Sequence, residues 1–70
     1  MATQSEVPAL LRRPEVQRRS GYSRSALYEA MARGEFPRPL KIGMSRSVAW
    51  VSSEVDQWIA TQIEAAQKKV

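Results

Sequence analysis

The spacing of apolar residues changes twice along this chain of 70 residues. Residues 23–34 have apolar positions three and four apart, residues 40–50 alternate large apolar residues with others, and helical spacing returns after residue 52. Spacings of three and four place side chains on one helical face, whereas alternation is typical of a strand. The predicted core face of the first helical block is Leu27, Ala30, Met31 and Gly34, and that of the last is Val55, Trp58, Ile59 and Ile63.

Residues that start or stop helices divide the first third of the chain. Pro14 fits a first helical turn, where its missing N–H is not needed, and Gly21 is a typical helix end. This short helix has Val16 as its one clear core residue. Ser23 has the chemistry of an N-cap for a second helix, which Gly34 can end. Two helices joined by so short a turn predict a helix-turn-helix.

Between the helical blocks, prolines and alternation predict a β-hairpin. Residues 36–40, with two prolines, cannot be helical. The strands on either side of a loop at residues 43–47 are expected to bury one face. The predicted buried residues are Leu40, Ile42, Val48 and Trp50. Arg46 is expected to project from the hairpin tip.

The last helix is expected to begin at Ser52 or Ser53, where Ser53 and Asp56 fit a capping box. Residues 1–9 are expected to form a flexible tail, and residues 65–70 a frayed basic end. Residues 10–64 then make one winged helix-turn-helix domain. This is an α+β fold, mostly helical, in the order helix, helix, two-stranded hairpin, helix.

The composition argues against several classes of protein. The chain has neither cysteine nor histidine, so it lacks thiolate metal ligands, the commonest zinc ligand and the commonest general base. Its carboxylates form no suggestive pair, so no enzyme, metal site, cofactor or small-molecule substrate is expected. No apolar run approaches the roughly 18 residues of a membrane span. A cytoplasmic protein that does not contact a membrane is expected.

Positive charge gathers in the first two thirds of the chain. Residues 10–47 hold nine basic and three acidic side chains, a net charge of +6, whereas residues 48–70 hold two lysines and three acids, a net charge of −1. Eight of the nine bases are arginines, whose planar guanidinium suits phosphates and guanine edges. The charge predicts a nucleic acid as the partner, with the alternative that the chain is basic by accident, and the predicted helix-turn-helix favours double-stranded DNA.

The second helix holds the candidate base contacts. Ser23 and Ser25 are small enough for DNA to approach the backbone, and a first helical turn offers free N–H groups to phosphate. Arg24 can reach a guanine or a phosphate, and Tyr28 offers a ring to a thymine methyl and a hydroxyl to a phosphate. The alternatives are that Ser23 only caps the helix and that Tyr28 packs against Phe36.

Further basic residues are expected to contact the DNA backbone. The hairpin would act as a wing beside the helix that reads the groove. These residues are Arg12, Arg13 and Arg18 near the first helix, and Lys41 and Arg46 in the hairpin. Trp50 and Trp58 are expected in the core, because each is in phase with other apolar residues.

Five segments in order resemble the AlpA family of small phage- and prophage-associated regulators. They are Glu15-Val16, SGYSRSALY (residues 20–28), GEFPRPLKIG (34–43), RSVAW (46–50) and SEVDQWI (53–59). The resemblance covers about Leu10 to Ala60 and implies a winged helix-turn-helix related to the MerR and excisionase domains. It also implies that residues 23–25 and Tyr28 belong to the recognition helix and that Arg46 lies in the wing. Arg19 departs from the family, which usually has an apolar residue there. Either its stem packs while the guanidinium reaches outward, or the first helix ends earlier.

The expected function is sequence-specific duplex-DNA binding in the bacterial nucleoid, as a transcriptional regulator of a phage or integrated element. One alternative is an excisionase that bends DNA at an attachment site, with a phage integrase as partner. A second is a protein-interaction module such as an anti-repressor. Because one recognition helix reads only a few base pairs, several copies are expected to bind adjacent sites cooperatively.

Overall fold

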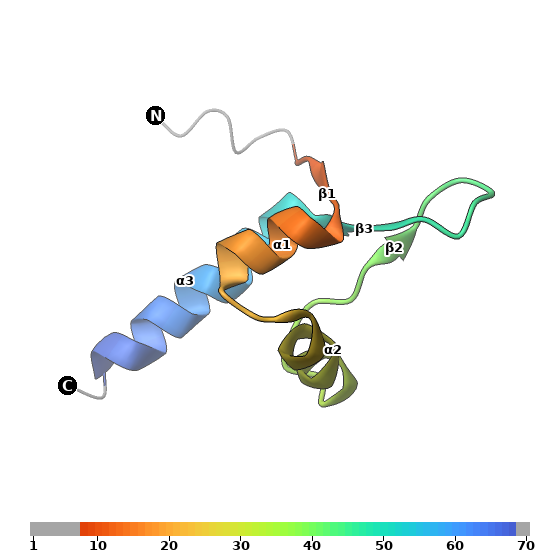
Figure 1. The fold of residues 1–70 in the computed structure, drawn as a ribbon. Coiled ribbons are helices and arrows are strands. Elements are labelled where there is room, and N and C mark those ends of the chain that lie inside the picture. Colours follow the sequence, from red (N-terminus) through yellow and green to blue (C-terminus); the bar gives the residue numbers. More distant parts are fainter. Residues whose placement is uncertain (1–7, 69–70) are drawn as a thin grey trace.

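The computed structural model describes residues 8–68, which form three helices and three short strands (Figure 1). Helices α1 (Arg13–Ser20) and α2 (Arg24–Ala32) are joined by the turn that the sequence predicts. Gly21 has a left-handed φ of 81°, and its N–H donates to the Gln17 carbonyl at 2.8 Å, which ends α1. The Ser23 hydroxyl accepts the Ala26 N–H at 3.2 Å, so the predicted N-cap is confirmed.

Gly34 ends α2 from outside the helix. Its N–H donates to the Met31 carbonyl at 3.0 Å, and the next N–H, of Glu35, donates to the Ala30 carbonyl at 2.8 Å. This pair of bonds around a glycine with a φ of 75° is a Schellman motif. Gly34 is therefore exposed, and its predicted place on the buried face is wrong, because the left-handed residue turns the chain away. Leu27, Ala30 and Met31 are buried as predicted.

The sheet has one strand more than the predicted hairpin. Strand β3 (Val48–Val51) lies between β2 (Leu40–Lys41) and an N-terminal strand β1 (Leu10–Leu11), all antiparallel. Ala49 faces Leu40 across one ladder, and Trp50 faces Leu11 across the other. The β2–β3 hairpin is confirmed, whereas β1 was missed because two residues cannot show a period.

The predicted buried face of the hairpin is wrong at Leu40, which is 52% exposed. Ala49 and Trp50, adjacent in β3, are both fully buried, so burial does not alternate along this strand. A central strand is covered on both faces, whereas the edge strand β2 is not. Ile42 and Val48 are half-buried, so of the four predicted residues only Trp50 belongs fully to the core.

Helix α3 (Ser52–Lys68) follows β3 without a loop, and its start at Ser52 is as predicted. The Ser52 N–H donates to the Ala9 carbonyl, and its hydroxyl accepts the Ala9 N–H, each at 2.7 Å. Ser53 lies inside the helix, so the predicted capping box is wrong. Ile63 is 53% exposed rather than buried, because α3 extends past the other elements (Figure 1). Residues 1–7 and 69–70, parts of the predicted tail and frayed end, lie outside the described residues.

The core joins all three helices to the sheet. Its largest fully buried side chains are those of Trp50, Leu27, Val16 and Val55. Beside them, the Phe36 ring packs edge-on against Trp58 and Tyr22, with centroids 4.8 and 6.0 Å away. The placement of Trp50 in the core is confirmed, whereas Trp58 is half-buried and packs against the core. Tyr22, not Tyr28, is therefore the tyrosine that packs on Phe36.

Candidate nucleic-acid interface

The N-terminal half of α2 presents a polar, exposed face. Its four predicted contact residues, Ser23, Arg24, Ser25 and Tyr28, are all exposed. They are exposed at the N-terminal end of α2, while Leu27, Ala30 and Met31 hold the helix against the core, so the helix can meet a partner without losing its packing. The Arg24 guanidinium carbon lies 5.9 Å from the centroid of the Tyr28 ring, within the range of a cation–π contact. Arg24 and Tyr28 therefore form one contiguous patch.

The hairpin extends from the helices as a separate projection (Figure 1). Lys41, on β2, and Arg46, in the loop after it, are both exposed. The loop is held by its own bonds: the Ser45 hydroxyl donates to the Ile42 carbonyl at 3.2 Å and accepts the Ser47 N–H at 3.1 Å. The two basic groups are thus displayed on an ordered wing.

The arginines of α1 are less available than the sequence predicts. Arg18 and Arg19 both bind the carboxylate of Glu15, with Arg19 Nε at 2.8 Å. Hydrogen bonds from Arg18 and then Arg19 lower the pKa of Glu15 to about 2. Arg19 Nη1 also lies 3.6 Å from Asp56, so this side chain links α1 to α3. Because α1 continues to Ser20, the alternative that it ends before Arg19 is wrong.

The two other arginines at the start of α1 remain candidates for backbone contacts. Arg12 is exposed just before the helix, and Arg13 donates to the side-chain oxygen of Gln17 at 3.0 Å. Among residues 8–68 neither one forms an ion pair. Their charge is not offset by a neighbouring carboxylate in this part of the chain.

A family comparison bears on this arrangement. The family model described as "Prophage CP4-57 regulatory protein (AlpA)" matches residues 9–63. The chain belongs to the AlpA family. A relative, the uncharacterized protein ORF88 of Enterobacteria phage P4, is 43% identical over 58 residues, which cover 83% of this chain and 65% of that protein. The match thus spans less than two thirds of the relative's length. No solved structure matched the chain.

Membership of the AlpA family assigns the chain to a regulatory family of phage origin. The matched range contains α1, α2 and the whole hairpin, and so every predicted contact residue. The predicted resemblance is therefore confirmed. The three helices and small antiparallel sheet are compatible with a winged helix-turn-helix.

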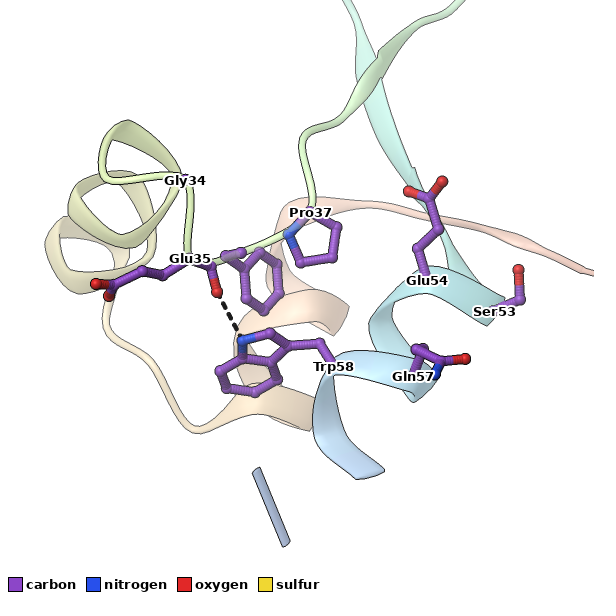
Figure 2. Close-up of a pocket in the computed structure, with 8 residues that line it drawn as sticks. Gly34, Glu35, Pro37, Ser53, Glu54, Gln57 and Trp58 are labelled. Carbon is purple, nitrogen blue, oxygen red and sulfur yellow. Dashed lines mark hydrogen bonds between the residues drawn. The ribbon is translucent and has the colours of Figure 1, made fainter. Parts of the chain in front are cut away.

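One hollow of this AlpA-family chain has no basic residue in its lining. It is open and lies between the segment after α2 and the start of α3, lined by Gly34, Glu35, Phe36, Pro37, Ser53, Glu54, Gln57 and Trp58 (Figure 2). The carboxyl groups of Glu35 and Glu54 lie on opposite sides and do not converge. Two carboxylates disfavour a phosphate, so this hollow is not part of the basic surface.

Two further features are absent from residues 8–68. No group of three or more carboxylate side chains there could hold a metal ion. No helix in the same span is both long and apolar enough to cross a membrane.

Sequence reasoning missed one basic residue beside the predicted surface. Arg38 is exposed and lines a smaller hollow together with Tyr28. From the sequence it counted only toward the net charge. The sequence did offer one signal: Arg38 stands between Pro37 and Pro39, and the two prolines restrict the backbone that carries its side chain.

Proposed function

We propose that this AlpA-family protein binds duplex DNA in a sequence-specific manner and regulates transcription of a phage or integrated element. The observation that carries the proposal is the exposed patch of Arg24 and Tyr28 at the N-terminal end of α2, a helix whose Leu27, Ala30 and Met31 are buried in the core. A helix of this kind can enter the major groove, because its outward side chains are free to meet base edges.

Each basic element has a distinct role in this proposal. The first turns of α2 lie in the major groove, where Arg24 meets a guanine and Tyr28 a thymine methyl or a phosphate. Ser23 and Ser25 allow close approach of the backbone. The wing contacts the sugar-phosphate backbone through Lys41 and Arg46, and the α1 side of the domain adds Arg12, Arg13 and Arg18.

The charge distribution supports the proposal independently of the fold. The net charge of +6 over residues 10–47 includes all of these groups, whereas residues 48–70, which include α3, have a net charge of −1. A basic surface attracts DNA over the range of the Debye length and gives non-specific binding first. Sequence preference then depends on α2. The protein would act in the cytoplasm, on the bacterial nucleoid.

The proposal is tested by footprinting the protein on the genomic segment that surrounds its gene. Protection of a promoter, lost in Arg24→Ala and retained in Arg33→Ala, is the expected result. Arg33 is a matched control, because it is an exposed arginine at the end of α2 that pairs with Glu35 at 3.2 Å.

Two other outcomes would redirect the assignment. Protection and bending of an attachment site would identify an excisionase, and an integrase would then be the partner. Absence of salt-sensitive binding to any duplex would contradict DNA binding and favour a protein-interaction module such as an anti-repressor.

A further inference from the structure

The smaller hollow of the domain lies at the border between α2 and the wing. Its lining is Tyr28, Met31, Ala32, Arg38 and Pro39. Apart from the Arg38 guanidinium and the Tyr28 hydroxyl, these side chains are apolar. Its volume is about 270 Å³, and it is open to solvent. That size is below the roughly 300–1,000 Å³ of pockets that enclose a small ligand, so it suits part of a larger molecule.

Arg38 is the only charged group of the lining, and its charge is not neutralised within residues 8–68, where it forms no ion pair. Its Nη2 atom lies 3.5 Å from the Met31 carbonyl oxygen, a long hydrogen bond at the C-terminal end of α2. A guanidinium has five N–H donors, so this contact leaves most of them free. The same contact offsets the partial negative charge of the helix end, which would otherwise repel an anion.

The length of α2 between Arg24 and Met31 is comparable to the width of a DNA groove. At 1.5 Å per residue, positions 24 and 31 are separated by about 10 Å along the α2 axis. The major groove of B-DNA is about 12 Å wide. A helix that places Arg24 against base edges therefore brings its Met31 end, and with it Arg38, close to a strand that borders the groove.

We infer that this hollow binds one deoxyribose-phosphate unit of the DNA backbone and that Arg38 is its phosphate ligand. The apolar lining fits the face of a sugar, and the free N–H groups of Arg38 fit the phosphate oxygens. Tyr28 then contributes to both surfaces, since it contacts Arg24 and also lines this hollow. The contact fixes the register of α2 in the groove without reading sequence itself. This inference rests on the proposed function.

The test replaces backbone phosphates of a footprinted duplex, one at a time, with uncharged methylphosphonates. Binding by the unaltered protein, Arg38→Gln and Arg33→Gln is measured on each duplex. Both variants lose one positive charge from an exposed arginine near the end of α2, and glutamine keeps a donor for the Met31 carbonyl. Thermal unfolding of each variant reports whether the fold is retained.

At one phosphate, we expect the methylphosphonate to weaken DNA binding by the unaltered protein and by Arg33→Gln about tenfold. The same duplex should be bound by Arg38→Gln nearly as well as the unmodified duplex. Arg38→Gln should also lower the salt slope by about one unit. If each methylphosphonate lowered the affinity of all three proteins by the same factor, the inference would be overturned, but the DNA-binding proposal would stand. Failure of the unaltered protein to bind DNA would instead contradict the proposed function. Should Arg38→Gln not fold, Arg38→Lys keeps the charge and must retain the sensitivity at that phosphate; its loss there would also overturn the inference.

Discussion

The indole N–H of Trp58, on α3, donates a hydrogen bond to the main-chain carbonyl of Glu35 at 2.8 Å (Figure 2). Two residues along, the carbonyl of Pro37 accepts the indole N–H of Trp50 at 3.0 Å. Both carbonyls belong to the segment that connects α2 to β2. The two tryptophans therefore fix this connection against the core, and with it the position of the wing relative to the recognition helix.

Trp50→Ala should unfold much of the protein. Trp50 is fully buried, and removing a buried aromatic ring costs about 3–5 kcal/mol of unfolding free energy. Stability of a domain this small is near the lower end of the usual range of about 5–15 kcal/mol. Trp58→Phe keeps a ring against Phe36 and should cost less, because it loses the hydrogen bond, worth about 0.5–1.5 kcal/mol, and only part of the ring packing. Denaturant unfolding followed by circular dichroism measures both. A Trp50→Ala protein that stays folded but loses DNA binding would show that Trp50 is not structural.

Features with a local cause could be predicted from the sequence. Gly21 and Ser23 end and begin helices through bonds to residues within four positions, so their roles follow from residue type. Features that depend on distant partners could not. The strand at residues 10–11 exists because β3 lies beside it, and Leu40 is exposed because β2 is at the edge of the sheet.

The same division holds for the candidate site. The exposure of Tyr28 follows from the periodicity of α2, which places it off the buried stripe, whereas Arg24 is exposed in the first turn of the helix. The pairing of Arg19 with Asp56 and the approach of Arg38 to the Met31 carbonyl join different elements. No pattern along the chain predicts such contacts, because they depend on how helices and strands pack.

Binding to DNA should depend steeply on salt. If about five basic side chains contact phosphates, the slope of log K against log salt should be about −4 to −5, because each contact releases a counterion. The expected groups are Arg12, Arg13, Arg38, Lys41 and Arg46, while Arg18 contributes less because it is paired with Glu15. Titrations at several salt concentrations measure the slope. A nearly flat response would contradict the DNA-binding proposal.

The ion pairs of Glu15 should stabilise the fold in a defined pH range. Because the pKa of Glu15 is lowered from 4.5 to about 2 in the folded protein, its contribution is present above about pH 4.5 and is lost as the pH falls toward 2. The difference in thermal midpoint between the unaltered protein and Glu15→Gln should therefore shrink over that range. The pairs are exposed, so the effect is best seen at low ionic strength. Glu64→Gln, on the exposed part of α3, is the control and should show no such trend.

Several copies are expected to bind adjacent DNA sites while the free protein stays mostly monomeric. One recognition helix reads few base pairs and makes a small interface, so contacts between neighbours would add affinity only on DNA. Analytical ultracentrifugation of the protein alone and with a long duplex tests this expectation. Either a stable dimer without DNA or saturation at one copy per site would contradict it.

Mutations in the recognition helix and in the wing should change DNA binding in different ways. Arg24→Ala and Tyr28→Ala should each cost about 1–3 kcal/mol of binding free energy at the cognate site and much less on scrambled DNA, because each removes a base contact. Arg46→Ala should weaken binding to both duplexes nearly equally and lower the salt slope by about one unit, because a wing residue contacts the DNA backbone. All three side chains are exposed, so none of these changes should unfold the protein.

The comparison requires each variant on cognate and scrambled duplexes at several salt concentrations, with circular dichroism to confirm the fold. Arg24 also contacts the Tyr28 ring, so the double variant should cost less than the sum of the two single changes. If Arg24→Ala lowers both affinities by the same factor, Arg24 is only a phosphate contact. If Arg46→Ala abolishes sequence preference, the wing reads bases, and the division of roles between α2 and the wing is wrong.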